Sequence, residues 1–214
     1  YMAGLARHIN IIMKDFSYDI PWVDDYLDKQ KLYNQFYQLY GYTLATDCPH
    51  PNFNIGDCCY LITLPHSYEW GQSILNQLLS ISITKIRLFV VKAGKTLDLH
   101  KDTIGQTDQL RHWAINVPLL HCDEGYNEFY EEEKNPGLVG IYAKKNSAIT
   151  PKIKTDWIPT YRTKLNCAKL LNVGKFHSCN NSMNSNNRYV ISYRSDNSST
   201  WQEMVKKIND IQSD

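Results

Sequence analysis

The feature that most constrains the fold is a long series of short β-forming segments between Ile81 and Tyr193. Each segment is rich in β-branched and aromatic residues, and turn residues separate one segment from the next without an intervening amphipathic helix. The segments cover residues 86–91, 96–100, 112–120, 138–143, 168–173, 176–179 and 188–193. Because no crossover helices connect them, the sequence predicts an antiparallel sandwich or barrel.

Helical patterns precede this region. Between Trp22 and Tyr40 apolar residues recur every three or four positions and acidic residues come first, so we expect a helix that stops at Gly41. Ser67 can cap a second helix that ends near Leu79. We therefore expect residues 1–80 to form a helical support for the β-rich core.

A further helical pattern closes the chain at about residues 199–213. Thr200 and Glu203 have the spacing of a capping box, and the residues that follow present one apolar face. This pattern predicts a helix that packs on the sheet. With a core at 81–195, the patterns fit a single domain, which is also what a length of 214 residues favours.

Charge and apolar patterning exclude several classes of partner. The chain has 23 Lys and Arg against 22 Asp and Glu, a formal net charge of +1, so no overall field attracts nucleic acid or an anionic membrane. The longest apolar run is much shorter than the roughly 20 residues of a membrane-spanning helix. We expect a soluble protein whose partner is a small-molecule or peptide substrate.

The cysteines indicate a reducing compartment. There are 6 of them at irregular spacing, too few in 214 residues for a disulfide-built scaffold, and the first residues lack a secretory signal pattern. We therefore expect a cytoplasmic protein. Cys48 and His50 followed by Cys58 and Cys59 form an incomplete zinc pattern, and the plainer alternative is a set of buried or half-buried thiols.

The pair His100 and Asp102 carries the strongest chemical signal. In a strand, side chains alternate between the two faces, so these two residues share one face. An imidazole and a carboxylate in this arrangement can supply two legs of the facial triad that binds non-haem iron. The alternative for the pair alone is a hydrogen-bonded surface contact.

A third ligand and a cation follow later in the chain. His177 lies at the start of one predicted strand, and Arg188 opens the next strand eleven residues later. If the two strands pair as a hairpin, His177 and Arg188 lie close across the ladder, and Ser192 shares the face of Arg188. Arg presents a rigid fork that binds a carboxylate through two hydrogen bonds.

This combination resembles the 2-oxoglutarate and Fe(II) dependent oxygenases, and more narrowly the aspartyl/asparaginyl β-hydroxylase family. Residues 171–180 followed by 188–192 look like the distal motif of that family. Residues 86–89, leading through Gly94 to His100 and Asp102, and the block 111–119 resemble its upstream half. The resemblance covers about residues 67 to 195.

The resemblance implies a double-stranded β-helix, the jelly roll that cupins share. It implies that His100, Asp102 and His177 are the catalytic metal ligands for Fe(II). It also implies that Arg188 binds the C5 carboxylate of 2-oxoglutarate, while Arg111 or His112 assists at the C1 carboxylate. Because strand alternation places those two residues on opposite faces, we favour Arg111. Ser192 is a candidate for a supporting hydrogen bond in the co-substrate site.

Residues 121–164 form a predicted loop-rich insertion whose two arms carry opposite charge. Acidic residues gather between Asp123 and Glu133, and basic residues between Lys144 and Lys164. One interpretation is a solvated hairpin, in which each exposed pair contributes little. The other is a lid over the substrate, since loops on rigid β scaffolds commonly carry specificity.

We therefore expect an enzyme, a dioxygenase that uses O2 and 2-oxoglutarate to hydroxylate an unactivated C–H bond, with an Asp or Asn side chain as one candidate target. Two other classes compete with this interpretation. A cupin-like protein that binds a metal or small ligand without catalysis would not need Arg188 beside His177. A zinc hydrolase could use the same three ligands but lacks an obvious general base near the motif.

Overall fold

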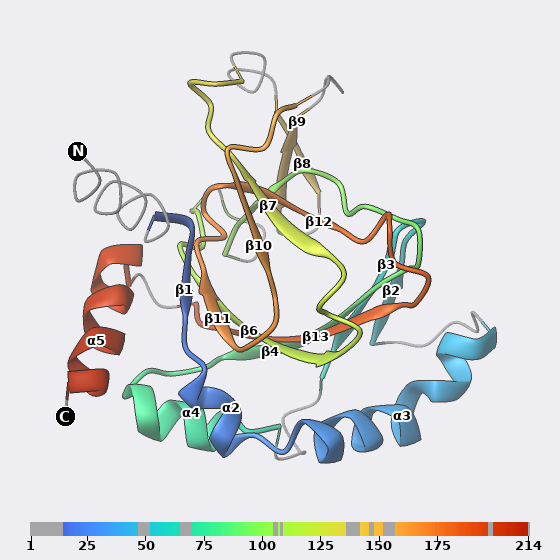
Figure 1. Ribbon diagram of the computed structural model, residues 1–214, viewed down its shortest axis with the longest axis horizontal. Coiled ribbons are helices and arrows are strands. Elements are labelled where there is room, and N and C mark those ends of the chain that lie inside the picture. The colour runs from blue at the N-terminus through green and yellow to red at the C-terminus, as the bar shows by residue number, and fades with distance from the viewer. Residues whose placement is uncertain are drawn as a thin grey trace.

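The computed structural model describes residues 15–46, 52–64, 70–104, 107, 109–135, 142–145, 148–151, 157–196 and 199–213. Its core is a double-stranded β-helix in which a larger and a smaller antiparallel sheet face each other (Figure 1). A cavity lies between the two sheets. The predicted fold class is therefore confirmed. Among the described residues no helix is long and apolar enough to cross a membrane.

The larger sheet has seven strands. In spatial order they are β1 (Ser17–Asp19), β11 (Lys169–Leu171), β6 (Ala114–Leu120), β13 (Arg188–Arg194), β4 (Lys85–Val91), β3 (Cys59–Thr63) and β2 (Phe53–Ile55). Strand β13 lies at its centre, with β4 on one side and β6 on the other. The strands β1, β2 and β3 lie in the part of the chain for which only helices and a loop were expected.

The smaller sheet holds β10 (Tyr161–Lys164), β7 (Tyr126–Tyr130) and β12 (Phe176–Asn180). On the free side of β12, the segment 96–100 adds two antiparallel bridges, Thr96 with Asn180 and His100 with His177. This segment continues into β5 (Lys101–Asp102), which pairs with the hairpin of β9 (Ala148–Pro151) and β8 (Tyr142–Lys145).

In the described part of the chain, four helices flank the larger sheet: α2 (Trp22–Tyr26), α3 (Lys29–Thr46), α4 (Gln72–Leu79) and α5 (Trp201–Ser213). Figure 1 shows α2, α3 and α4 along the side of this sheet that faces away from the smaller one. Leu88 and Ile191 of the sheet share one buried cluster with Phe36 of α3, Leu75 of α4 and Met204 of α5. The outer face of the larger sheet therefore holds the main hydrophobic core.

The helix predicted over 22–40 is wrong in its bounds, because the chain forms two helices there. The side chain of Asp28 accepts a hydrogen bond of 2.9 Å from the backbone N–H of Lys31 and so starts α3 anew. Gly41 lies within α3 and does not end it, since the helix continues to Thr46. At the other end of the chain the capping box is confirmed: the N–H of Thr200 donates to Glu203 at 2.7 Å and the N–H of Glu203 donates to Thr200 at 3.3 Å.

The predicted hairpin of 176–179 with 188–193 is also wrong. Strand β12 pairs with β7 in the smaller sheet, whereas β13 pairs with β4 and β6 in the larger one. Between the two strands, the polar segment from Asn181 to Asn187 crosses from one sheet to the other. The Asn181 side chain anchors this crossing through bonds to the carbonyls of Val91, Lys92 and Asn186 at 3.2, 3.1 and 3.1 Å.

The insertion predicted at 121–164 is shorter than expected, because β7 and β10 at its two ends are strands of the smaller sheet. Its oppositely charged arms meet where Arg162 lies in register with Glu128. Arg162 Nε donates to Glu128 Oε1 at 2.8 Å. Lys144 and Lys145 lie in β8, and Lys152 and Lys154 lie outside the described residues.

Candidate metal centre and its cavity

His100 and His177 are brought together by a local antiparallel bridge. The backbone N–H of His100 donates to the carbonyl of His177 at 3.0 Å, and the reverse bond measures 2.8 Å. Residues directly opposite in such a bridge present their side chains on the same side. The two imidazole ring centroids are accordingly 4.3 Å apart.

Asp102 joins the two histidines from the strand that carries His100. Its position two residues further on places it on the same face, and its N–H is held by the carbonyl of Val173 at 2.9 Å. The candidate ligand atoms of His100, Asp102 and His177 all lie within 4.8 Å of one another. His100 Nε2 and Asp102 Oδ1 are 3.7 Å apart. The structure thus brings together all three residues that the sequence singled out.

The backbone sets the orientation of both imidazoles. His100 Nδ1 lies 2.7 Å from the carbonyl of Asp98, and His177 Nδ1 lies 2.9 Å from that of Lys175. Because a carbonyl can only accept, each Nδ1 carries a proton, which leaves Nε2 as the nitrogen that offers a lone pair to a metal in the neutral imidazole. A hydrogen bond of this kind from the non-ligating nitrogen is the usual outer support of a metal-bound histidine.

Burial and neighbouring charges favour the neutral form of His177 and the ionised form of Asp102, which are the forms that bind a metal. Burial, reinforced by the nearby His100, lowers the pKa of His177 to about 3. For Asp102 burial acts to raise the pKa, but Arg194 and His100 outweigh it and the pKa falls to about 2. A neutral imidazole and an ionised carboxylate are the states that ligation requires.

Arg194 is a site residue that the sequence analysis missed. Its Nη1 forms an ion pair of 2.8 Å with Asp102 Oδ2, and both side chains are almost completely buried. Its Nε donates to Ser192 Oγ at 3.2 Å. Arg194 lies an even number of residues from Arg188 and Ser192, so it shares their face of the strand, and this periodicity could have identified it from the sequence. The predicted strand, however, ended one residue too early.

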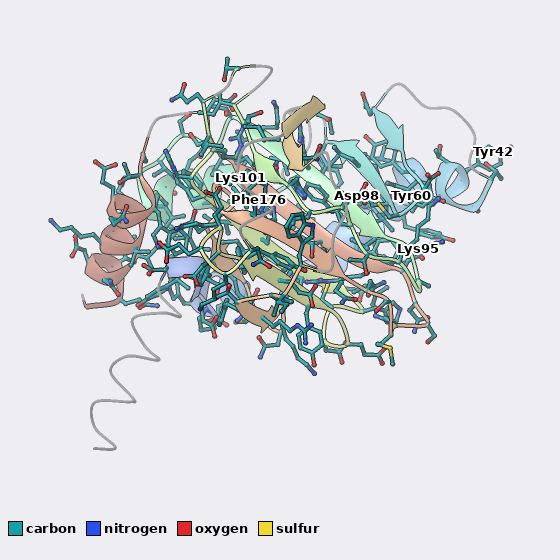
Figure 2. The ribbon with its side chains drawn as sticks, turned by 90° about the horizontal axis from the view of Figure 1, so that it is seen from above. Tyr42, Tyr60, Lys95, Asp98, Lys101 and Phe176 are labelled. Atoms are coloured by element: carbon teal, nitrogen blue, oxygen red, sulfur yellow. The ribbon has the colours of Figure 1, made fainter. Side chains whose placement is uncertain are left out.

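A cavity of about 490 Å³, counted with the solvent space at its opening, lies between the two sheets and is lined by two of the three candidate ligands, His100 and His177. Its polar lining comprises His100, His177, Arg194, Asn116, Asn127, Ser178 and Cys179, and its apolar lining comprises Phe89, Val91, Leu97, Leu171, Val173 and Val190. Outside the cavity, Lys101 Nζ lies 4.3 Å from the centroid of the Phe176 ring; both residues are labelled in Figure 2. Both candidate histidine ligands and Arg194, the ion-pair partner of Asp102, therefore line one cavity.

Arg188 is completely buried beside this cavity, next to two of its lining residues. Nη1 donates to Cys179 Sγ at 2.7 Å, and Nη2 donates to Asn127 Oδ1 at 3.5 Å. Nε is buried with no hydrogen-bond partner, and no carboxylate of the described residues forms an ion pair with the guanidinium. A buried cation without a counter-ion is costly, so this position is suited to an anionic ligand.

Two cavity-lining amides are also incompletely satisfied. Asn116 Oδ1 and Asn127 Nδ2 are buried and have no hydrogen-bond partner. Buried polar atoms are nearly always paired, so a cluster of unpaired ones around a cavity indicates a polar ligand. With the three candidate metal ligands at one position and Arg188 at another, the residues present fit a metal ion together with an acidic co-substrate.

The remaining predicted site residues have other partners. Arg111 donates from Nη1 to the carbonyl of Ser195, and its Nη2 lies 2.7 Å from Asp196 Oδ1. Both of its terminal nitrogens are therefore used away from the cavity, which Arg111 does not line. Ser192 is buried and accepts a hydrogen bond from Arg194, so it supports that arginine.

The chain is similar in fold to solved structures at low sequence identity. SnoN, a non-haem alpha-ketoglutarate-dependent epimerase from nogalamycin biosynthesis, matches with a TM-score of 0.52 and 12% identity over 90% of this chain and 83% of its own. HygX from Streptomyces hygroscopicus, solved with nickel and 2-oxoglutarate, gives a TM-score of 0.49 and 11% identity over 87% and 85%. No family profile and no curated protein matches the sequence. At this identity the likeness to SnoN concerns the fold.

Proposed function

We propose that the protein is a non-haem Fe(II) and 2-oxoglutarate dependent oxygenase that hydroxylates an unactivated C–H bond. His100, Asp102 and His177 would hold the metal, and Arg188 would bind the C5 carboxylate of the co-substrate. When bound, the metal and 2-oxoglutarate together supply the oxidising power from O2, with release of succinate and CO2. The contribution of the chain is to hold, orient and enclose these groups.

The observation that carries this proposal is the pairing of the ligand cluster with a buried cation that has no counter-ion. His177 and Cys179 lie on the same face of β12, roughly 7 Å apart along the strand. Cys179 contacts Arg188, so a ligand that reaches from the His177 position to Arg188 must span a similar length. A five-carbon dicarboxylic acid has that length and an anionic group at each end.

Different residues around the cavity would position the metal ligands and limit access of water. Arg194 fixes Asp102 through the ion pair, and the carbonyls of Asp98 and Lys175 fix the two imidazoles. Phe89, Val91, Leu97 and Val190 supply apolar walls that limit the water around the reacting groups. Orientation by supporting partners of this kind is what precise metal chemistry requires.

The test is co-substrate turnover by the metal-free protein after reconstitution. With Fe(II), ascorbate and 2-oxoglutarate under air, we expect succinate to form slowly even without an added substrate. The same protein reconstituted with zinc is the control and should form none. Succinate formation absent with Fe(II), although calorimetry shows that Fe(II) and 2-oxoglutarate bind, would indicate a cupin-like binding protein. Hydrolysis of test esters by the zinc form alone would indicate a hydrolase.

Which side chain is hydroxylated requires a separate experiment. The resemblance to aspartyl/asparaginyl β-hydroxylases directs the first search to Asp and Asn residues in peptides. Stimulation of succinate formation by a peptide, together with a mass increase of one oxygen atom in that peptide, would identify a substrate.

A further inference from the structure

A second group of cations lies around Arg194, the ion-pair partner of Asp102. It comprises Lys85, Arg87, Arg111 and Arg194, which we call the metal-end cluster. Only two carboxylates of the described residues interact with it, Asp102 and Asp196. With four cations against two carboxylates, the surroundings of Asp102 carry an excess of positive charge, and of the four cations Arg194 lines the cavity.

Two members of the cluster are already neutralised. Arg111 pairs with Asp196 at 2.7 Å, and Arg194 pairs with Asp102 at 2.8 Å. Lys85 and Arg87 form no ion pair with any described residue. The Nε of Arg87 is moreover buried without a hydrogen-bond partner.

Strand register places Arg87 on the face that looks into the β-helix. Arg87 lies opposite Ser192 of β13, and Phe89, two residues further along β4, lines the cavity. Residues two apart on a strand share a face, as do residues directly opposite in a ladder. Burial lowers the pKa of Arg87 while the charge of Asp102 raises it, which also puts Arg87 within electrostatic reach of the proposed metal ligand.

Arg87 and Arg188 start from well-separated positions along the larger sheet. Arg188 lies in register with Val91, four residues beyond Arg87 along β4, which is roughly 13 Å of strand. This exceeds the length that separates the ligand cluster from Arg188. The strand register therefore separates Arg87 from Arg188 as candidate positions for an anion.

We propose that Arg87 binds a carboxylate of the substrate, so that the enzyme acts on carboxylate-bearing molecules and prefers an acid to the corresponding amide. The inference rests on the proposed function, because it assigns the substrate side of the same metal centre. It also separates the two candidate side chains, since a guanidinium fork suits the carboxylate of Asp and leaves the amide nitrogen of Asn facing like donors.

The experiment uses acetate as the probe and acetamide as its neutral isostere. The full chain is loaded with Mn(II), whose paramagnetism enhances proton relaxation of nearby molecules, and saturated with 2-oxoglutarate so that the Arg188 position is filled. Wild type should show saturable relaxation of the acetate methyl protons and at least ten-fold weaker binding of acetamide. Arg87→Gln should weaken acetate binding at least ten-fold, and Arg87→Lys should weaken it less.

Lys95→Gln is the matched control, because it removes one positive charge from an exposed position and should leave the acetate titration unchanged. If wild type does not bind acetate more tightly than acetamide, the inference is wrong whatever the variants do. Equal acetate binding by wild type and Arg87→Gln would likewise overturn it, since acetate would then contact the metal alone. Failure of the protein to bind Mn(II) or 2-oxoglutarate would instead contradict the proposed function.

Discussion

The two faces of β13 differ as strongly as any two regions of the molecule. Its outward residues Ile191 and Tyr193 are completely buried against the helices, in the main hydrophobic cluster. Its inward residues Arg188, Ser192 and Arg194 are also buried, yet they are polar and lie in or beside the cavity. One strand thus contributes to stability on one face and to the candidate site on the other.

The comparison shows that the outer face of β13 stabilises the fold, whereas the inner face is arranged for chemistry at a cost in stability. Burial of apolar side chains on the outer face is favourable by about 25 cal/mol per Å². On the inner face, unpaired atoms such as Arg188 Nε and Asn116 Oδ1 are buried at a cost. Substitutions on the outer face should therefore affect folding, and substitutions on the inner face should affect ligand binding.

The largest effect is expected from His177→Ala. It removes one of three proposed metal ligands and should weaken Fe(II) binding by more than about 100-fold, beyond the range seen when only an outer supporting partner is lost. The unfolding midpoint of the metal-free protein should change little, because the imidazole packs against the cavity. Lys175→Ala, an exposed neighbour, is the control for binding and stability. Unaltered Fe(II) affinity in a calorimetric titration would exclude His177 as a ligand.

A second prediction compares adjacent residues on opposite faces. Ile191→Ala should lower the free energy of unfolding by about 2 to 5 kcal/mol, since it opens a hole in the main cluster. Val190→Ala, which only widens an existing cavity, should cost less. Urea unfolding of the metal-free proteins measures both changes. Equal losses would show that the cavity wall is packed as tightly as the core.

These contrasts also explain how far the sequence could predict the structure. The pairing of His100 with Asp102 on one face follows from strand periodicity, which is local. The relation of His177 to Arg188 does not follow from strand periodicity, because local patterns do not show whether consecutive strands pair with each other or enter opposite sheets. The segment 181–187 resembles a hairpin turn although it crosses between sheets.

Strands β7 and β10 were missed for a related reason. Their outward positions carry charges such as Glu128 and Arg162, so the segments resemble solvated arms. In the structure Glu128 is buried, and it accepts hydrogen bonds from Arg162 at 2.8 Å and from the Tyr130 hydroxyl at 3.0 Å. A charged residue that is paired with a residue far along the chain cannot be distinguished, by sequence pattern, from a charged residue that is exposed to water.

A third, smaller effect concerns the co-substrate. Arg188→Lys keeps the charge but loses the fork, so 2-oxoglutarate binding should weaken by about 1.5 to 3 kcal/mol, the range for hydrogen bonds to charged groups. Fe(II) binding should stay within about two-fold, because the outer supports of the metal ligands are unchanged. Calorimetric titration of the Mn(II)-loaded protein with 2-oxoglutarate measures the change, and Arg162→Lys, on the outside of the smaller sheet, is the control. An unchanged dissociation constant would remove Arg188 from the site.

The smallest change in stability is expected at Glu132, which lies in the 121–164 insertion and away from both faces of β13. Glu132 pairs with Lys101, but 39% of its side chain is exposed, and Lys101 keeps its contact with the Phe176 ring. Exposed ion pairs contribute about 0 to 1 kcal/mol, so Glu132→Gln should change the free energy of unfolding by less than about 0.5 kcal/mol. Urea unfolding of wild type and Glu132→Gln tests this directly.

The same variant helps to decide whether the insertion acts as a lid. Strand β9 pairs with β5 at Asp102, so hydrogen exchange at the amides of residues 148–150 should slow when the metal binds. A lid that closes over substrate should in addition slow exchange at residues 131–135 only when co-substrate and substrate are both present, and Glu132→Gln should then reduce hydroxylation while uncoupled succinate formation persists. Equal protection in all states, with unaltered hydroxylation, would mean that the insertion is a fixed extension of the ligand strand. Substrate selection would then fall to side chains of the β-helix itself, Arg87 first among them.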